Sequence, residues 1–257
     1  IDDKHLIALV PTNKVDVTRP CDLAEEILRI YGYNNIDFPY NVKSSLSYNP
    51  KPDKEKIQYT ITSFLAANGF NETMNNSLSV GAYYENNEDY PAEKSVKILN
   101  ALSSDLNVMR QTLLYSGLEV LAFNLNRNVS NLKTFEFGNC YQKNIGAPDN
   151  LNVEKRFKEE KHLSLFVTGK LSNDSWQGKA QNADFFYLKN IVFNVLQRLR
   201  ININNIEQKD CEAKYLSQGL SLVNKESKKV IAELGSVNND LKKRFDIKQD
   251  VFYADLN

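Results

Sequence analysis

Two stretches, LKTFEFGNCYQ at residues 132–142 and HLSLFVTGKLS at residues 162–172, show the side-chain alternation expected of β-strands. Similar patterns predict strands near residues 213–223 and 229–237, and a last strand in VFYADL at residues 251–256. The spacing of these strands is typical of hairpins rather than of repeated strand–helix–strand units. The sequence therefore predicts an antiparallel sheet.

Helical patterns accompany the predicted strands. Asp53 can cap a helix that runs to about Asn68, and residues 109–128, MRQTLLYSGLEVLAFNLNRN, read as one long helix. Asp184 can cap the helix FFYLKNIVFNVLQRLR, and NNDLKKRF at residues 238–245 predicts a short one. The charged stretch from about Gly146 to Lys161 predicts an exposed loop. The expected fold class is α+β, an antiparallel sheet flanked by helices.

Residues 1–38 predict a separate small α/β unit. Leu6–Val10 reads as a short strand, and DLAEEILRIYGY at residues 22–33 as a helix with Asp22 at its N-cap and Glu25 three residues later. Residues 39–52, PYNVKSSLSYNPKP, contain three prolines and little periodicity, which indicates a linker. The domains expected are thus 1–38 and 53–257.

The composition limits the possible classes of protein. Of 257 residues, 42% are hydrophobic and 25% charged, which excludes wholesale disorder. Lys+Arg and Asp+Glu both number 32, so net charge does not drive the chain onto nucleic acid or an anionic membrane. No apolar run approaches the roughly 18 residues of a membrane span. Three cysteines without a CxxC pattern argue against disulfides and zinc, and favour a reducing, cytoplasmic location.

Familiar catalytic motifs are missing from the sequence. It holds no GxxxxGK[ST], GxGxxG or GxSxG, and a nucleophile pair such as Cys21 with His5 lacks an orienting third group. His162 is interpreted as a structural or surface residue. Trp176 is interpreted as a partly exposed packing residue, with a stacking platform as the alternative. Lys242–Arg244 is interpreted as a solvated helix face, with RNA phosphate contact as the alternative.

Four carboxylates form the one cluster that suggests chemistry: Asp16, Asp22, Glu25 and Glu26. The last three are spaced i, i+3, i+4, so they share one end of the predicted helix. Hard oxygen ligands suit magnesium or calcium. The spacing alone favours a plainer explanation, in which Asp22 and Glu25 cap the helix and Glu26 pairs with Arg29. A metal here would also need waters or a second subunit.

Longer blocks of the sequence resemble a known family. VDVTRPCDLAEEILRIYGYNNI, at residues 15–36, closely resembles a segment of the β subunits of bacterial phenylalanyl-tRNA synthetases. So do four further blocks, although Lys14 stands where that family usually has Arg, and Ala101 and Asn239 where it commonly has Pro. These blocks are GFNETMNNSL, VKILNALSSDLNVMRQTLLYSGLEVLAFNLNRN, FEFGNCY and ELGSVNNDLKKRFDIKQDVFYADLN. Together they extend over essentially the whole chain.

The resemblance implies an α₂β₂ class II synthetase that attaches phenylalanine to tRNA(Phe) with ATP. Residues 1–38 would be the end of a small helix-containing module, and residues 53–257 a catalytic-like module with the class II fold. The resemblance also implies that ATP would be bound by the α subunit of the holoenzyme and not by this segment. The family's Mg²⁺ ligands, shared with α, map to Asp16, Asp22, Glu25 and Glu26. Modules for tRNA binding, editing and anticodon reading would lie outside this segment.

The catalytic-like module is expected not to catalyse. Class II sites hold ATP phosphates with arginines, whereas the corresponding strand here, Phe135–Gly138, contains none, and no Gly-x-Gly-x-Gly occurs. The segment alone would be an inactive assembly partner of the α subunit, with the apolar helix 53–68 as a candidate interface or simply part of the core. Two alternatives stay open, a stand-alone enzyme with a carboxylate-bound metal and a nucleic-acid-binding module.

Overall fold

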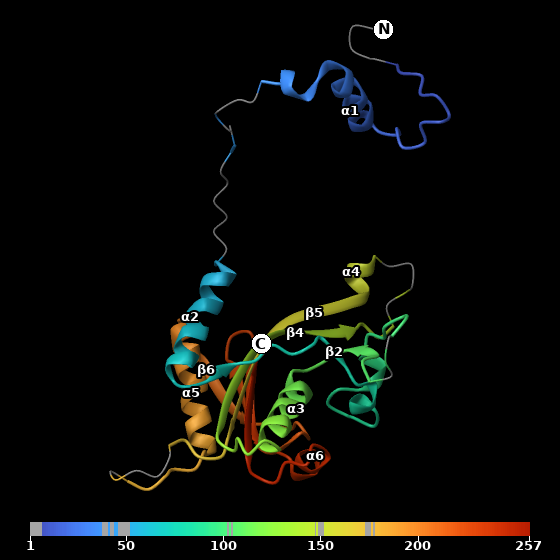
Figure 1. Ribbon diagram of the computed structural model, residues 1–257. Coiled ribbons are helices and arrows are strands. Elements are labelled where there is room, and N and C mark those ends of the chain that lie inside the picture. The colour runs from blue at the N-terminus through green and yellow to red at the C-terminus, as the bar shows by residue number, and fades with distance from the viewer. Residues whose placement is uncertain are drawn as a thin grey trace. The chain divides into compact units, whose positions relative to one another are not determined.

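The computed structural model describes residues 7–37, 41, 44–45, 52–101, 103, 105–146, 148, 152–172, 176 and 178–257. The chain divides into two compact units, Ile1–Lys51 and Pro52–Asn257, and each is described here by itself (Figure 1). Within the described residues, no helix combines the length and the apolar character that crossing a membrane requires.

The first unit contains helix α1, Pro20–Tyr31, and a short 3₁₀ turn η1, Tyr33–Asn35. The helix begins earlier than the sequence predicts, because Pro20 suits the first helical position, where no backbone N–H is needed. Asp22 is therefore not the N-cap. It stands at the third helical position, and its carboxylate accepts a hydrogen bond from the backbone N–H of the N-cap residue Arg19.

The predicted strand at Leu6–Val10 is wrong over residues 7–10, which are not in a strand, and Leu6 lies outside the described residues. Gly32, with φ +93°, ends α1 as expected of a glycine at this place. None of the described residues of this unit is buried, and Ile30 of the apolar stripe is 93% exposed. The stripe on α1 thus has no described core to pack against.

The second unit is built on a seven-stranded sheet in the order β1-β4-β5-β9-β8-β7-β6. Only β1 runs parallel to its neighbour, so the prediction of a mainly antiparallel sheet is confirmed. The strands are β1 Asn71–Glu72, β4 Leu132–Lys143, β5 Phe157–Thr168, β6 Ile206–Asp210, β7 Leu216–Asn224, β8 Val230–Val237 and β9 Val251–Leu256.

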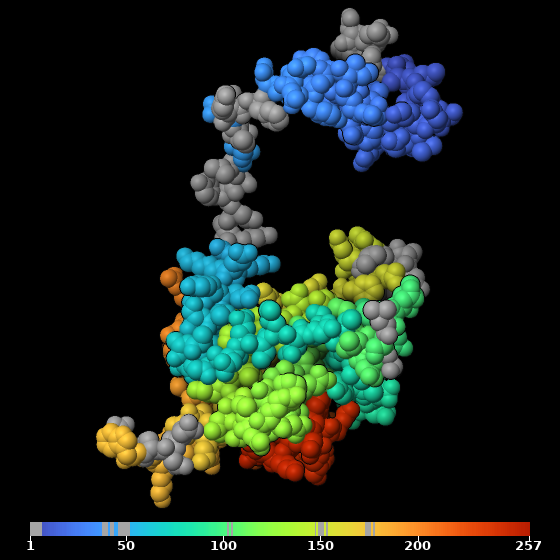
Figure 2. All heavy atoms as spheres, viewed as in Figure 1, coloured from blue at the N-terminus to red at the C-terminus, as the bar shows by residue number. Residues whose placement is uncertain are grey.

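Helices cover both faces of this sheet. Helices α2, Lys54–Ala67, and α5, Phe185–Arg198, pack on one face around Ile61, Leu65 and Leu188. Helices α3, Leu114–Leu125, and α6, Asn239–Arg244, belong to a second core on the other face. Figure 2 shows α3 in green beside α6 in red on the outside of that face.

Two of the three predicted caps, both in the larger unit, are confirmed. Asp53 accepts hydrogen bonds from the backbone N–H groups of Glu55 and Lys56 at the start of α2, and Asp184 accepts one from Tyr187 at the start of α5. Because each cap depends on residues only two or three positions away, the sequence carries the whole signal.

Two segments without a clear strand pattern of their own differ from the prediction. The helix expected over 109–128 begins only at Leu114, because β3, Val108–Met109, pairs with β2, Leu78–Ser79. The predicted loop up to Lys161 instead contains α4, Val153–Arg156, and the first residues of β5. This charged part of β5 pairs with β4 as far as Lys143 opposite Phe157.

Candidate functional site

The predicted metal ligands lie in the first unit, where two of them are engaged by neighbouring cations. Asp22 accepts hydrogen bonds from the backbone N–H groups of Thr18 and Arg19, at 3.2 and 2.8 Å, and from the Arg19 guanidinium at 3.0 Å. The Arg19 side chain and these backbone groups together lower the pKa of Asp22 to about 2. Its carboxylate is therefore ionised and already paired.

Glu26 is paired in the same way. Its Oε1 lies 3.4 Å from Lys14 Nζ and 3.0 Å from Arg29 Nη1, as the plainer explanation of this helix predicted for Arg29. Asp16 and Glu25 are exposed. In the part of the chain that the structure describes, no group of three or more His, Cys, Asp or Glu residues is placed to hold a metal ion. The arrangement thus does not form a metal centre by itself, and the four-ligand site stays a prediction.

A second cluster lies in the larger unit, on β4. Arg110 Nη1 donates to Glu136 Oε1 at 2.7 Å, and Arg110 Nε donates to the carbonyl of Asn139 at 2.9 Å. The two charged side chains are 5% and 4% exposed. Asn75 completes the cluster by donating its backbone N–H and its side-chain amide to Glu136.

Gly138 lets the guanidinium lie against β4. A Cβ at this position would come within 2.2 Å of Arg110 Nη2 and 2.7 Å of Leu113 Cδ2, closer than real contacts allow. The sequence of the strand contains no arginine, but the fold brings one onto it from 26 residues away. Because this arginine is buried and ion-paired, it is not available to an external phosphate.

Sequence reasoning missed this cluster. Arg110 falls within the helix predicted over residues 109–128, and the sequence analysis gives it no role. The sequence offered no signal for it, because the burial of Arg110 and of its neighbours Gln111 and Thr112 is a property of the fold. Its partner could not be found from the sequence, because the pairing depends on the sheet.

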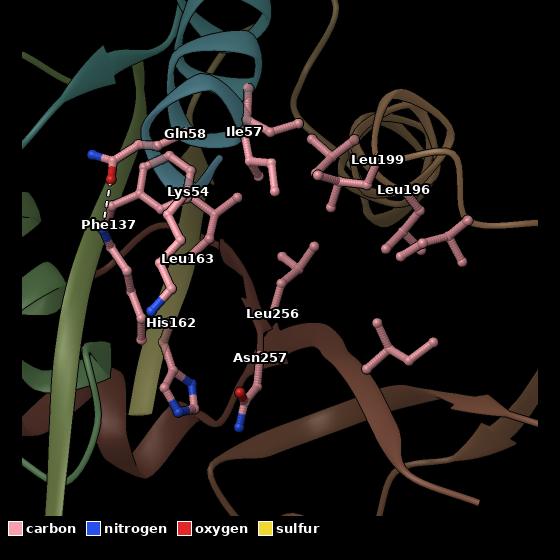
Figure 3. Close-up of a pocket in the computed structure, with 15 residues that line it drawn as sticks. Lys54, Ile57, Gln58, Phe137, His162, Leu163, Leu196, Leu199, Leu256 and Asn257 are labelled. Atoms are coloured by element: carbon pink, nitrogen blue, oxygen red, sulfur yellow. Dashed lines mark hydrogen bonds between the residues drawn. The ribbon is translucent and has the colours of Figure 1, made fainter. Parts of the chain in front are cut away.

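An apolar cavity of about 330 Å³ lies between α2, α5 and the sheet (Figure 3). Its wall includes Ile57 and Ile61 of α2, Leu196 of α5, Leu199 at the C-cap of α5, and Leu256 of β9. At its edge Lys161 donates to the side-chain oxygen of Gln58, the hydrogen bond drawn in Figure 3. The apolar stripe of α2 is thus largely core, since Ile61 and Leu65 are 1% and 0% exposed.

The remaining candidate residues take different positions. Trp176 is 92% exposed, so the packing interpretation is wrong. The basic run 242–244 is not a uniformly solvated face, because Lys242 is 5% exposed and pairs with Asp250 at 3.0 Å. His162 is structural, with an ion pair to Asp255, and His5 lies outside the described residues.

Comparison with known families settles the relationship. A family model described as phenylalanyl tRNA synthetase beta chain CLM domain matches residues 42–257, and one described as tRNA synthetase B5 domain matches residues 1–33. The chain belongs to the phenylalanyl tRNA synthetase beta chain family. The resemblance seen in the sequence is thereby confirmed, and the larger unit is a CLM domain.

Individual relatives agree with the family. The chain is 43% identical to a phenylalanine–tRNA ligase beta subunit of Bacteroides fragilis over 253 residues, which is 98% of this chain and 31% of the relative. A beta subunit of Porphyromonas gingivalis is 36% identical, over 99% of this chain and 31% of its own length. The chain thus spans about a third of the length of the curated relatives it matches.

The fold of the CLM domain also occurs among solved synthetases. A pyrrolysyl-tRNA synthetase from Desulfitobacterium hafniense superposes with a TM-score of 0.57 at 16% identity, over 80% of this chain and 66% of that one. At this identity the likeness concerns the fold alone. It confirms the predicted α+β fold of the class II synthetase type.

Proposed function

We propose that this chain is a non-catalytic segment of a phenylalanine–tRNA ligase beta subunit, which supports a catalytic α subunit. The observation that supports the proposal is the buried ion pair between Arg110 and Glu136. On the strand where a class II enzyme would present an arginine to ATP, the arginine is ion-paired to Glu136 and 5% exposed. A buried guanidinium with its own carboxylate cannot offset developing phosphate charge.

The proposal assigns the ligase activity to an α₂β₂ assembly. In it the α subunit binds ATP and phenylalanine, and tRNA(Phe) is the acceptor. Since the apolar stripe of α2 is core, contact with the α subunit would use the outer side of this helix, where Tyr59 is 74% exposed. A cytoplasmic location remains a prediction that follows from this role.

Magnesium is part of the same proposal. Asp16, Asp22, Glu25 and Glu26 supply hard oxygen ligands, but Asp22 and Glu26 are paired with Arg19, Lys14 and Arg29 in the chain by itself. A shared site would require these cations to give way when the α subunit docks. The hypothesis of a stand-alone carboxylate-metal enzyme receives no support from the described residues.

Co-purification with the α subunit, with and without Mg²⁺, tests the proposal. We expect the chain to be retained by a tagged α subunit, and Asp22→Ala combined with Glu26→Ala to weaken retention or its dependence on Mg²⁺. The matched control is Glu93→Ala with Glu154→Ala, which removes two exposed carboxylates of the larger unit that lie outside α2. Retention by α with an unchanged Mg²⁺ dependence in the first variant contradicts the magnesium site, and no retention of the unaltered chain contradicts the assembly role.

A further inference from the structure

His162 links two strands of the sheet through its contact with the Asp255 carboxylate. Its Nδ1 lies 2.9 and 3.1 Å from the two carboxylate oxygens of Asp255, and both side chains are 15% exposed. His162 belongs to β5 and Asp255 to β9, where Asp255 is directly paired with Ser164. The histidine side chain therefore reaches diagonally from β5 to Asp255, the second-last residue of β9.

Asp255 also faces a second carboxylate. Glu233 of β8 is its direct partner in the antiparallel register, so both side chains are on the same face of the sheet. Directly opposed side chains have Cβ atoms about 4.5–5.5 Å apart, and like charges there are destabilising. Glu233 accepts a hydrogen bond from Tyr215 Oη at 2.7 Å, which is a neutral donor and leaves the negative charge in place.

The basic side chains near Asp255 have other hydrogen-bond or ion-pair partners. Arg110 is paired with Glu136, Lys158 with Glu160, and Lys161 donates to Gln58. Among the described residues, the side chain that the structure places within hydrogen-bond distance of the Asp255 carboxylate is the imidazole of His162, which carries a positive charge when it is protonated.

We propose that His162, Asp255 and Glu233 form a proton-dependent clamp on the end of β9. With His162 protonated, the clamp fixes this end onto β5. With His162 neutral, two facing carboxylates remain, and the last residues of β9 loosen. Asn257, whose N–H donates to the carbonyl of Ile231 at 3.0 Å, follows this end and lines the cavity of Figure 3 together with His162.

Charged and titratable side chains on the neighbouring strands surround His162 and affect its pKa. Burial lowers the pKa of His162, and the nearby charge of Lys158 also lowers it slightly. The hydrogen bond and the charge of Asp255, together with the charge of Glu160, raise it by more, so the pKa of His162 is raised above its usual value of 6.5. Further groups face the same side of the sheet from β4, β8 and β9. They are Glu136 with Arg110, Cys140, whose pKa is raised by burial, Glu233, and Tyr253, whose pKa is also raised by burial.

The stabilisation that His162 contributes depends on pH. A histidine pKa that is higher in the folded than in the unfolded chain stabilises the fold below the unfolded value. That contribution is lost as the pH rises through the folded value. The clamp is therefore closed at mildly acidic pH and opens toward alkaline pH.

NMR titration of the imidazole tests the geometry directly. The chain contains two histidines, so His5→Gln leaves His162 as the single signal. We expect its pKa to lie above 6.5, to fall in Asp255→Asn, and to fall by less in Glu233→Gln. A titration at or below 6.5 in the His5→Gln chain, or one that Asp255→Asn does not change, overturns the proposal.

Hydrogen exchange of the amides at Asp255–Asn257 tests the consequence. Between pH 5.5 and 8.5 their protection factors should fall in the unaltered chain, by about tenfold for each unit by which folding raises the His162 pKa. They should be low and independent of pH in His162→Gln. If that variant does not fold, the unaltered chain alone decides, because constant protection across this range overturns the clamp.

Discussion

At Gly138 the lack of a side chain determines how Arg110 lies. The guanidinium occupies the space that a Cβ would take, and from there it reaches both Glu136 and the carbonyl of Asn139. One glycine thus allows a charged residue to be buried against a strand. The proposal that this strand has no free arginine depends on that contact.

Gly138→Ala should destabilise the chain. Because the new methyl group would overlap Arg110 and Leu113, we expect a loss of about 1–3 kcal/mol in the free energy of unfolding, measured by urea denaturation. Gly178→Ala is the matched control, since a Cβ there meets nothing within 4 Å. Equal stability of the two variants would show that Arg110 does not lie on Gly138.

Glu136→Gln removes one charge of the buried pair. The Arg110 charge would remain buried without its partner, so we expect a loss of about 3–5 kcal/mol in the free energy of unfolding. Glu88→Gln breaks the exposed pair with Lys214 and should cost less than about 1 kcal/mol. A Glu136→Gln chain as stable as the Glu88→Gln chain would contradict the buried ion pair.

At the scale of elements, the helices and strands that could be predicted from the sequence are those whose signals lie in neighbouring residues. The caps Asp53 and Asp184 and the strands β4, β7, β8 and β9 were predicted, because their signals are contained in neighbouring residues. The charged start of β5 was missed because it has no apolar alternation of its own, and β3 was missed because it is only two residues long; both are held by pairing with another strand. Arg110 was misplaced together with β3.

The candidate metal site shows the same limit. Its four carboxylates could be selected from spacing and from the family resemblance, but not the cations that engage them. Lys14 reaches Glu26 from 12 residues earlier, on a segment without regular structure. Because α1 begins at Pro20, Asp22 lies at the third helical position and not at the N-cap, where it was predicted.

Asp184→Ala tests an element that was predicted in full. Loss of the hydrogen bond to the Tyr187 N–H should lower the free energy of unfolding by about 1 kcal/mol, seen as a lower midpoint in thermal or urea unfolding. Asp240→Ala, which removes an exposed carboxylate near the start of α6, should change it by less than about 0.5 kcal/mol. A larger effect at Asp240 than at Asp184 would contradict the capping role.

At the scale of the whole molecule, the larger unit is a class II synthetase fold with both faces of its sheet covered by helices. The smaller unit contains no buried residue among those described, and its helix exposes an apolar stripe. The chain spans about a third of its relatives' length. These features agree with the proposed role as a part of a larger assembly.

ATP–pyrophosphate exchange in the presence of phenylalanine tests the central proposal most directly. The purified chain, assayed alone with Mg²⁺, should show no exchange above the level without enzyme, because Arg110, which packs on β4, is held by Glu136 within the fold. Phenylalanine-dependent exchange catalysed by the chain alone, and retained in a preparation free of any α subunit, would contradict it.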